Sequence, residues 1–210
     1  MTAPNIIFDA ITVTRQNAFA FDVWYANHYL PAALATSPGS AVQCYGSPLR
    51  ATYLAIFDAC ATSPGTAGPS IPEPINDSII AVERYSASFI GAQKTAAVND
   101  SIYEAPLLYP VFFRVPAARE ADFNAWYMEE HLPILLRCPY WPACRRYRID
   151  QPRPDAWTHV ALHYLTDLRA LESAARTEAR ATPWRARLAA EEWFRGDYRV
   201  YYRHGQRRGA

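Results

Sequence analysis

Residues 120–147 read EADFNAWYMEEHLPILLRCPYWPACRRY, and this stretch decides the fold. Its apolar residues recur at helical spacing, and Pro133 cannot donate a backbone hydrogen bond to the carbonyl of Glu129. The helix is therefore predicted to kink or restart at that proline. A second proline-marked turn and a short strand that ends near Ile149 are expected to follow.

The chain contains this stretch twice. Residues 21–45 read FDVWYANHYLPAALATSPGSAVQCY, and an offset of 102 superimposes identical residues of the two stretches without a gap. The identical residues of the first stretch are Phe21, Trp24, Tyr25, Leu30, Pro31, Leu34 and Tyr45. We interpret the chain as an internal duplication, with repeat 1 at residues 1–105 and repeat 2 at residues 106–210.

Alternation of apolar and polar residues predicts the strands around each helix. The expected strands lie at 5–13, 51–58, 101–104, 107–115, 157–165 and 198–203. A further helix is expected at about 75–94, and another at 167–180 that is interrupted at Thr182-Pro183-Trp184 and resumes to Phe194. A loop rich in proline, glycine and serine is expected at 63–74. Each half then has the order β-α-β-β-α-β of a ferredoxin-like unit, so the fold class is α+β. Two such units are expected to pack their antiparallel sheets together as an α+β barrel.

Composition narrows the partners. The chain has 210 residues, 50% of them hydrophobic, and a net charge of +1 with its basic residues spread out, which disfavours nucleic acid. No apolar run is long enough to span a membrane, and the first residues do not resemble a signal peptide. Cys44, Cys60, Cys138 and Cys144 form no C-x-x-C pair, so reduced thiols in the cytoplasm are expected rather than a zinc site.

The pattern F-x-x-W-Y-x-x-E-H-L-P at 123–133, followed by R-R-Y at 145–147, resembles the EthD-like family of dimeric α+β barrel proteins. The resemblance implies a pocket between sheet and helices, lined by His131. It also implies a pseudo-dimer within one chain, and it leaves further homodimerisation open. Members of that superfamily include cofactor-independent lyases, cyclases, isomerases and monooxygenases, and more distant haem enzymes.

The histidines are distributed unequally between the two halves. His131, His159 and His163 in the second half correspond to Tyr29, Tyr53 and Phe57 in the first, at offsets of 102 and 106. This favours a histidine-bearing pocket in repeat 2 and a modified pocket in repeat 1. His131 is the candidate general base, and Tyr127, His159 and His163 would polarise a developing oxyanion. Alternatively, His131 could bond a carbonyl that the kink frees, Tyr127 could be core packing, and the strand histidines could face the inter-sheet layer or solvent.

The candidates for substrate binding are Trp126, Arg114, Tyr29 and Tyr53. Arg145 and Arg146 could meet an anionic group of the substrate, but they are more simply explained as solvated charges. On a strand His159 and His163 would lie about 13 Å apart, too far to share one metal ion.

The predicted function is a cofactor-independent lyase, cyclase or isomerase that acts on a small aromatic or polyketide-like molecule. The alternatives are a haem-dependent enzyme with His131 as axial ligand, a cofactor-free monooxygenase, or a non-catalytic ligand-binding protein.

Overall fold

A computed structural model of the chain describes residues 5–35, 41–47, 51–59, 78–150, 156–205 and 208–209. The chain divides into two compact units, one comprising Met1–Ser88 and Tyr201–Ala210, the other Phe89–Val200. The division between the units therefore falls within a strand, between Ser88 and Phe89. The boundary between the two sequence repeats at 105–106 stays a prediction. No helix among the described residues is long and apolar enough to cross a membrane.

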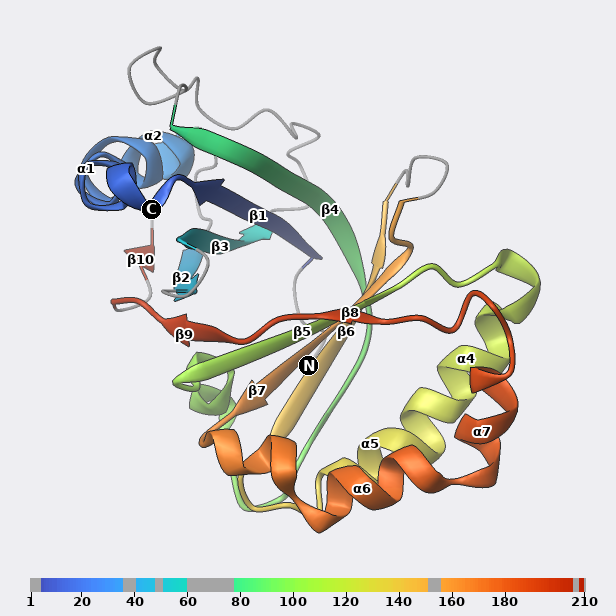
Figure 1. Cartoon of the computed structure of the whole chain (residues 1–210). Coiled ribbons are helices and arrows are strands. Elements are labelled where there is room, and N and C mark those ends of the chain that lie inside the picture. The colour runs from blue at the N-terminus through green and yellow to red at the C-terminus, as the bar shows by residue number, and fades with distance from the viewer. Residues whose placement is uncertain are drawn as a thin grey trace. The chain divides into compact units, whose positions relative to one another are not determined.

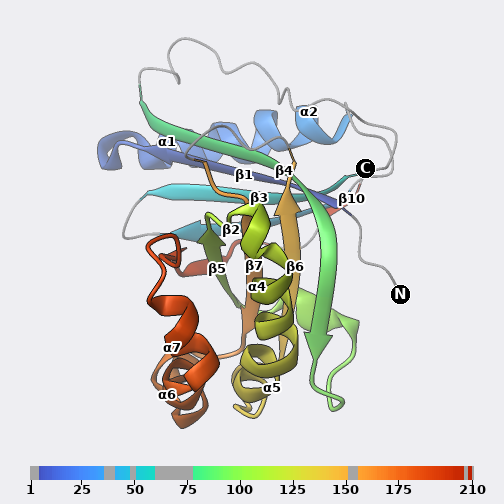
Figure 2. The same cartoon turned by 90° about the vertical axis from the view of Figure 1, so that its right-hand side faces the viewer.

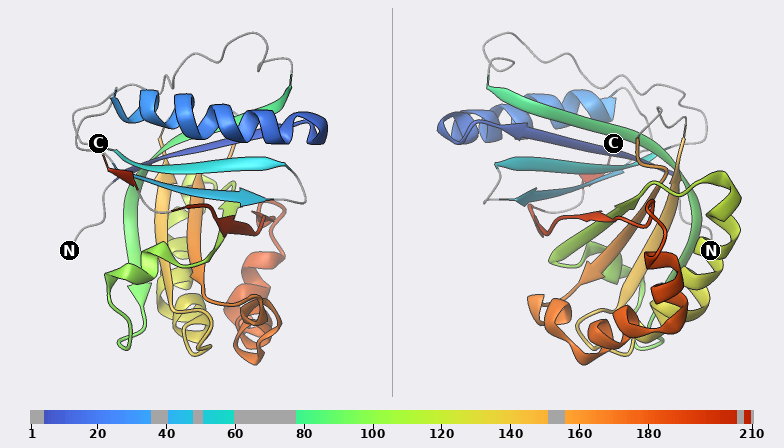
Figure 3. Two further views of the ribbon diagram at one scale, coloured as in Figure 1. Left: turned by 90° about the vertical axis from the view of Figure 1, so that its left-hand side faces the viewer. Right: turned by 45° about the vertical axis from the view of Figure 1, so that its right-hand side comes forward.

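The first unit is an antiparallel sheet with helices on one face (Figure 3). Its strands are β1 (Asn5–Val13), β2 (Ala41–Ser47), β3 (Thr52–Ala59) and β4 (Ile79–Lys94), which continues into the second unit. They are arranged in the order β2-β3-β1-β4, and β9 (Tyr201–Arg203) and β10 (Arg208–Gly209) pair with β2. Between β1 and β2 run α1 (Ala18–Trp24), a π-helical turn (Tyr25–Tyr29) and α2 (Leu30–Ala35).

The second unit repeats this arrangement. Strands β5 (Leu107–Phe113), β6 (Ala143–Ile149), β7 (His159–Leu165) and β8 (Asp197–Tyr198) have the order β6-β7-β5-β8, with antiparallel pairs throughout. The helices α4 (Glu120–Trp126), α5 (Leu132–Leu135), α6 (Ala174–Ala181) and α7 (Pro183–Ala189) lie together on one face of these strands (Figures 1 and 2). Numbered within a unit, both sheets have the order 2-3-1-4 of a ferredoxin-like fold.

The interruption predicted at Pro133 is present as a π-helical turn, Tyr127–His131, between α4 and α5. Because Pro133 has no N–H, the ladder of hydrogen bonds must shift there, and a wider turn accommodates the shift. The first unit has the equivalent turn before Pro31. Single π-helical turns are frequent at functional sites because they re-aim side chains.

Two predicted elements are wrong. Residues 79–94 form β4 and not a helix, since pairing with β1 from Ile6↔Ala87 to Val13↔Ile79 places the first part of this segment in a sheet. Residues 101–104 belong to the 3-10 helix Asp100–Glu104 and not to a strand, because the Asn99 side chain caps it by accepting from the Ser101 N–H. The loop predicted at 63–74 lies outside the described residues.

A charged cluster around Asp9 lies in the core of the first unit. Asp9, on β1, is only 1% exposed, accepts hydrogen bonds from the Tyr29 hydroxyl and from Arg84, and lies 3.0 Å from the nearest guanidinium nitrogen of Arg84. A buried carboxylate is tolerated only where it is paired and hydrogen-bonded. Burial, followed by Asp9, raises the pKa of Tyr29 well above its usual value, so this residue stays a neutral donor.

Asp9→Ala is expected to lower the free energy of unfolding by about 3 kcal/mol, because it leaves Arg84 half-buried without its carboxylate. Tyr29→Phe is the matched control: it removes one hydroxyl, keeps the ion pair, and should cost about 1 kcal/mol. Urea denaturation measures both changes. Equal losses in the two variants would contradict the dominance of the ion pair.

Candidate active site

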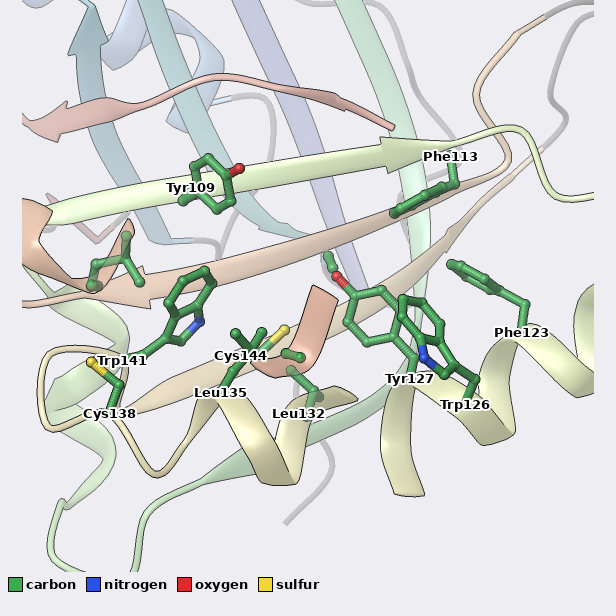
Figure 4. Packing of buried hydrophobic residues seen from close by; sticks show 14 of the residues in the cluster. Tyr109, Phe113, Phe123, Trp126, Tyr127, Leu132, Leu135, Cys138, Trp141 and Cys144 are labelled. Carbon is green, nitrogen blue, oxygen red and sulfur yellow. The ribbon is translucent and has the colours of Figure 1, made fainter. Parts of the chain in front are cut away.

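A cavity of about 200 Å³ lies in the second unit, between the helices and the sheet. Its walls are mainly aromatic and come from β5, from the helical segment around the π-helical turn, and from the end of β7. The lining residues that the site depends on are Tyr109, Trp126, Tyr127, His131, Trp141 and His163. Figure 4 shows Tyr127 and Trp126 side by side, with Trp141 beyond Leu135. Enclosed aromatic cavities with a few polar atoms are typical of small-molecule sites.

A chain of hydrogen bonds links three of the residues that line this cavity. The Trp141 Nε1–H donates to His163 Nδ1 at 3.0 Å, and His163 Nε2 lies 2.8 Å from the Tyr127 hydroxyl oxygen. Tryptophan can only donate, so Nδ1 is the acceptor and Nε2 carries the proton of the neutral imidazole. His163 therefore donates to Tyr127, whose own O–H remains available to a ligand. All three side chains are at most 2% exposed, which makes the arrangement rigid.

His131 projects from the end of the π-helical turn and stacks on Trp126, with ring centroids 4.5 Å apart. One ring nitrogen bonds the backbone of Ala179, and Nδ1 has no hydrogen-bond partner among the described residues. Burial lowers the pKa of His131 to about 3, so the ring is neutral near pH 7 and Nδ1 is an acceptor. The indole N–H of Trp126 likewise has no partner in the described part of the chain. These unpaired polar atoms are unusual in a folded interior.

Arg146 is buried behind Tyr127 and is not the solvated charge expected from the sequence. It is 2% exposed, its guanidinium carbon lies 4.4 Å from the centroid of the Tyr127 ring, and one nitrogen donates to Asn124 at 2.6 Å. Burial raises the pKa of Tyr127, and the Arg146 charge opposes that rise. Arg146 would therefore stabilise negative charge that develops near the Tyr127 hydroxyl.

The structure brings together four of the predicted site residues: His131, His163, Tyr127 and Trp126. His159 lies elsewhere on β7, with Nε2 3.4 Å from Glu120, and lines a separate cavity. Arg114 is exposed and stacks on Trp157 at 4.4 Å.

The two tyrosines predicted to bind substrate belong to the first unit. Tyr29 is buried against Asp9, and Tyr53 donates to the Ala18 carbonyl at 2.7 Å at the edge of a different cavity.

Several lining residues are not among those predicted from the sequence, including Trp141 and the arginines Arg176, Arg180 and Arg185. Trp141 lies between two prolines and was interpreted only as part of a turn. Its place next to a proline turn, in the repeat that carries the histidines, was the available signal. Arg176 and Arg180 are one turn apart on a predicted helix and Arg185 follows its predicted interruption, which by itself indicates a solvated face.

Comparisons with known proteins identify the fold and leave the family open. No family model matches the sequence, and no curated protein matches it. Among solved structures, an anthrone oxidase-like protein has a TM-score of 0.67 at 10% identity, over 99% of this chain and 95% of that one. A ferredoxin fold protein from Listeria monocytogenes, related to antibiotic biosynthesis monooxygenases, gives 0.52 at 8% identity, over 97% and 96%.

A heme-degrading enzyme from Listeria monocytogenes has a TM-score of 0.52 at 7% identity and covers 94% of this chain and 98% of its own. These likenesses confirm the predicted fold class, that of the ferredoxin-like α+β barrel proteins. They do not confirm the narrower resemblance to the EthD-like family. At such low identity they establish the fold alone.

Haem does not fit the cavity of the second unit. A volume of about 200 Å³ is below the range of drug-sized ligands, and the macrocycle is larger still. His131, the predicted axial ligand, is sandwiched against Trp126 and bonded through its other nitrogen to Ala179. No group of three or more metal-ligating side chains occurs among the described residues.

The buried histidines predict an acid-sensitive second unit. His131 has a pKa of about 3 in the folded protein against 6.5 for the free side chain, so between these values the unfolded chain binds more protons. Stability is therefore complete above about pH 6.5 and falls as the pH drops towards 3, by about 4 kcal/mol from this residue. The pKa of His163 is lowered by burial in the same sense.

His131→Phe is expected to flatten the dependence of the unfolding free energy on pH between about 6 and 4. Urea denaturation followed by circular dichroism measures it, and His204→Phe is the control because His204 is exposed. An unchanged slope in the His131 variant would show that this imidazole is accessible to protons in the folded state.

Proposed function

We propose that the second unit is a cofactor-independent enzyme that removes a proton from a small aromatic or polyketide-like ligand, as a lyase, cyclase or isomerase does. One observation carries the proposal. His131, which has an unpaired acceptor at Nδ1, and Tyr127, which has a directed O–H donor, line the same aromatic cavity. General-base catalysis next to a carbonyl needs this combination of acceptor and donor.

The proposed step transfers one proton. A carbonyl or phenol oxygen of the ligand accepts a hydrogen bond from the Tyr127 O–H, which His163 holds in orientation. A proton on the adjacent carbon, or on the phenol, passes to His131 Nδ1, and its electron pair becomes an enolate or phenolate. Return of the proton from His131 to a different carbon completes an isomerisation. The buried charge of Arg146 lowers the energy of the anion.

The surroundings of His131 determine which interactions make the proton transfer favourable. A pKa of about 3 makes His131 a weak base in the empty cavity. Proton transfer therefore depends on stabilising the anion that is formed, and Tyr127 and Arg146 provide this from fixed positions. His159 and Arg114 have no part in the step, since neither lines this cavity.

Cofactor-free monooxygenation is the second candidate. The anthrone oxidase-like protein, similar in fold over nearly the whole chain, favours it. It would begin with the same deprotonation, after which the carbanion would react with molecular oxygen. Oxygen uptake in air, compared with exchange under nitrogen, separates this reaction from isomerisation.

Anthrone tests the common step, because its methylene protons are acidified by a carbonyl through two aromatic rings. We expect the protein to speed exchange of these protons for deuterium under nitrogen, as observed by NMR. Tyr127→Phe should slow the catalysed exchange by about 100-fold, as loss of an oxyanion donor does. His131→Ala should slow it by at least about 100-fold.

Tyr25→Phe is the matched control. Tyr25 is the equivalent of Tyr127 in the first unit, buried and with its hydroxyl unpaired among the described residues. Its loss should leave the exchange rate unchanged. Wild-type rates in both the Tyr127 and His131 variants would refute the proposed base and donor.

A further inference from the structure

Three arginines on α6 and α7 line the same cavity as Tyr127 and His163. Arg176 and Arg180 are one turn apart on α6, and Arg185 follows on α7 after the helix break at Thr182. Each reaches the cavity from the helix layer. The positive charge on this side of the cavity therefore comes from residues that line it and not from a distant surface.

No carboxylate of the described residues forms an ion pair with these three arginines. The acidic side chains of the same and neighbouring helices are engaged elsewhere. Glu178 pairs with Arg137 at 2.6 Å, Asp122 pairs with Arg187 at 2.7 Å, and Glu130 accepts from the Thr182 hydroxyl at 2.6 Å. Arg176 donates to the backbone carbonyl of Leu171 at 2.8 Å and also hydrogen-bonds the Tyr109 side chain. Arg185 donates to the backbone carbonyl of Arg180 at 3.2 Å and lies over the ring of Phe194.

Such a cluster is costly without an anion. Like charges at positions i and i+4 of a helix repel each other, which applies to Arg176 and Arg180. Burial, followed by the charges of Arg180 and Arg176, lowers the pKa of Arg185. The end of α6 favours a cation at Arg180, but Arg176 lies too far from that end to benefit in the same way. A bound anion would relieve all three repulsions.

The exposure of the lining residues distinguishes an inner end of the cavity from an outer end. Tyr127, His163 and Trp141 at one end are 1–2% exposed, whereas Arg180 is exposed, Arg176 and Arg185 are half-buried, and Tyr198 is 53% exposed. The aromatic end is therefore the inner end, and the arginines form the rim. A ligand that matches this profile has an apolar ring and an anionic group at its outer side.

We propose that the cavity binds an aromatic carboxylic acid, with its ring at the inner end and its carboxylate on Arg176, Arg180 and Arg185. The guanidinium group pairs with a carboxylate through two parallel hydrogen bonds, which suits a planar anion. The claim that an aromatic carboxylic acid is the substrate rests on the proposed function. The claim that the cavity binds such an acid does not.

The same anion would tune the base. Arg185, Arg146 and Arg180 all act to lower the pKa of His131, after burial. A carboxylate at the rim opposes the charges of Arg185 and Arg180, so it raises the basicity of His131 when the ligand is bound. Binding of an aromatic acid would thus make His131 a stronger base.

Binding of 2-naphthoate and of its neutral isostere 2-naphthamide tests the proposal, measured by quenching of tryptophan fluorescence. We expect wild-type protein to bind the carboxylate at least about tenfold more tightly than the amide. The variant with Arg176→Met, Arg180→Met and Arg185→Met should bind the two compounds equally. Arg137→Met, a loss of charge on the same helix layer outside the cavity, should keep the preference.

Salt provides a second measurement that needs no variant. The preference for naphthoate should fall as ionic strength rises, whereas binding of naphthamide should not change. Equal affinities for the two compounds in the wild type, no saturable binding of naphthoate, or a preference retained in the triple variant would each overturn the proposal.

Tyr127→Phe separates this inference from the proposed function. It should keep the preference for naphthoate, since the arginines are intact, and slow the catalysed proton exchange by about 100-fold. Intact exchange on anthrone without a preference for the carboxylate would overturn the anion site alone. A preference for the carboxylate without exchange in the wild type would overturn the proposed reaction alone.

Discussion

The hydrogen bond between Tyr127 and His163 is the interaction on which the site of the second unit depends, because it joins the helix layer to the sheet inside the core. It has a defined direction only because Trp141 occupies the other nitrogen of the same imidazole. Removing either neighbour would leave a buried donor or acceptor unpaired, which costs more than the bond itself contributes. The turn that carries Trp141, the π-helical turn that carries Tyr127 and strand β7 are thus held in one arrangement. The cavity is the space that this arrangement leaves open.

The two units differ at the positions that correspond to His131 and Val111 of the second unit. At an offset of 102, Tyr29 and Asp9 of the first unit correspond to His131 and Val111 of the second. In the first unit Tyr29, Asp9 and Arg84 are hydrogen-bonded to one another, so the polar groups of these three side chains are paired. In the second unit the carboxylate is gone, Val111 lines the cavity, and Nδ1 of His131 has no partner among the described residues. One scaffold therefore holds a closed polar network in one copy and open binding capacity in the other.

The duplication made much of this predictable. The offset located the helix break, most of the strands, and three residues that meet in the cavity, Tyr127, His131 and His163. Residues 79–94 were misjudged because their strand pairing with β1 depends on residues more than sixty positions away, which no local period reveals. The Trp141–His163 contact is similarly non-local. The rim arginines were not predicted because arginines on a helix normally indicate a solvated face, and only the fold shows that Arg185 on α7 joins Arg176 and Arg180 at one cavity.

The charge state of the cavity connects recognition with chemistry. Burial and the nearby arginines make His131 a weak base, and a neutral ligand would not change this or compensate the positive charges. An anionic ligand changes both conditions at once, since its charge offsets the arginines and favours a proton on the imidazole. Basicity in this site would then be a property of the complex and not of the protein alone. Selectivity would follow, because a ring that enters without its anion occupies the cavity next to a base too weak to react with it.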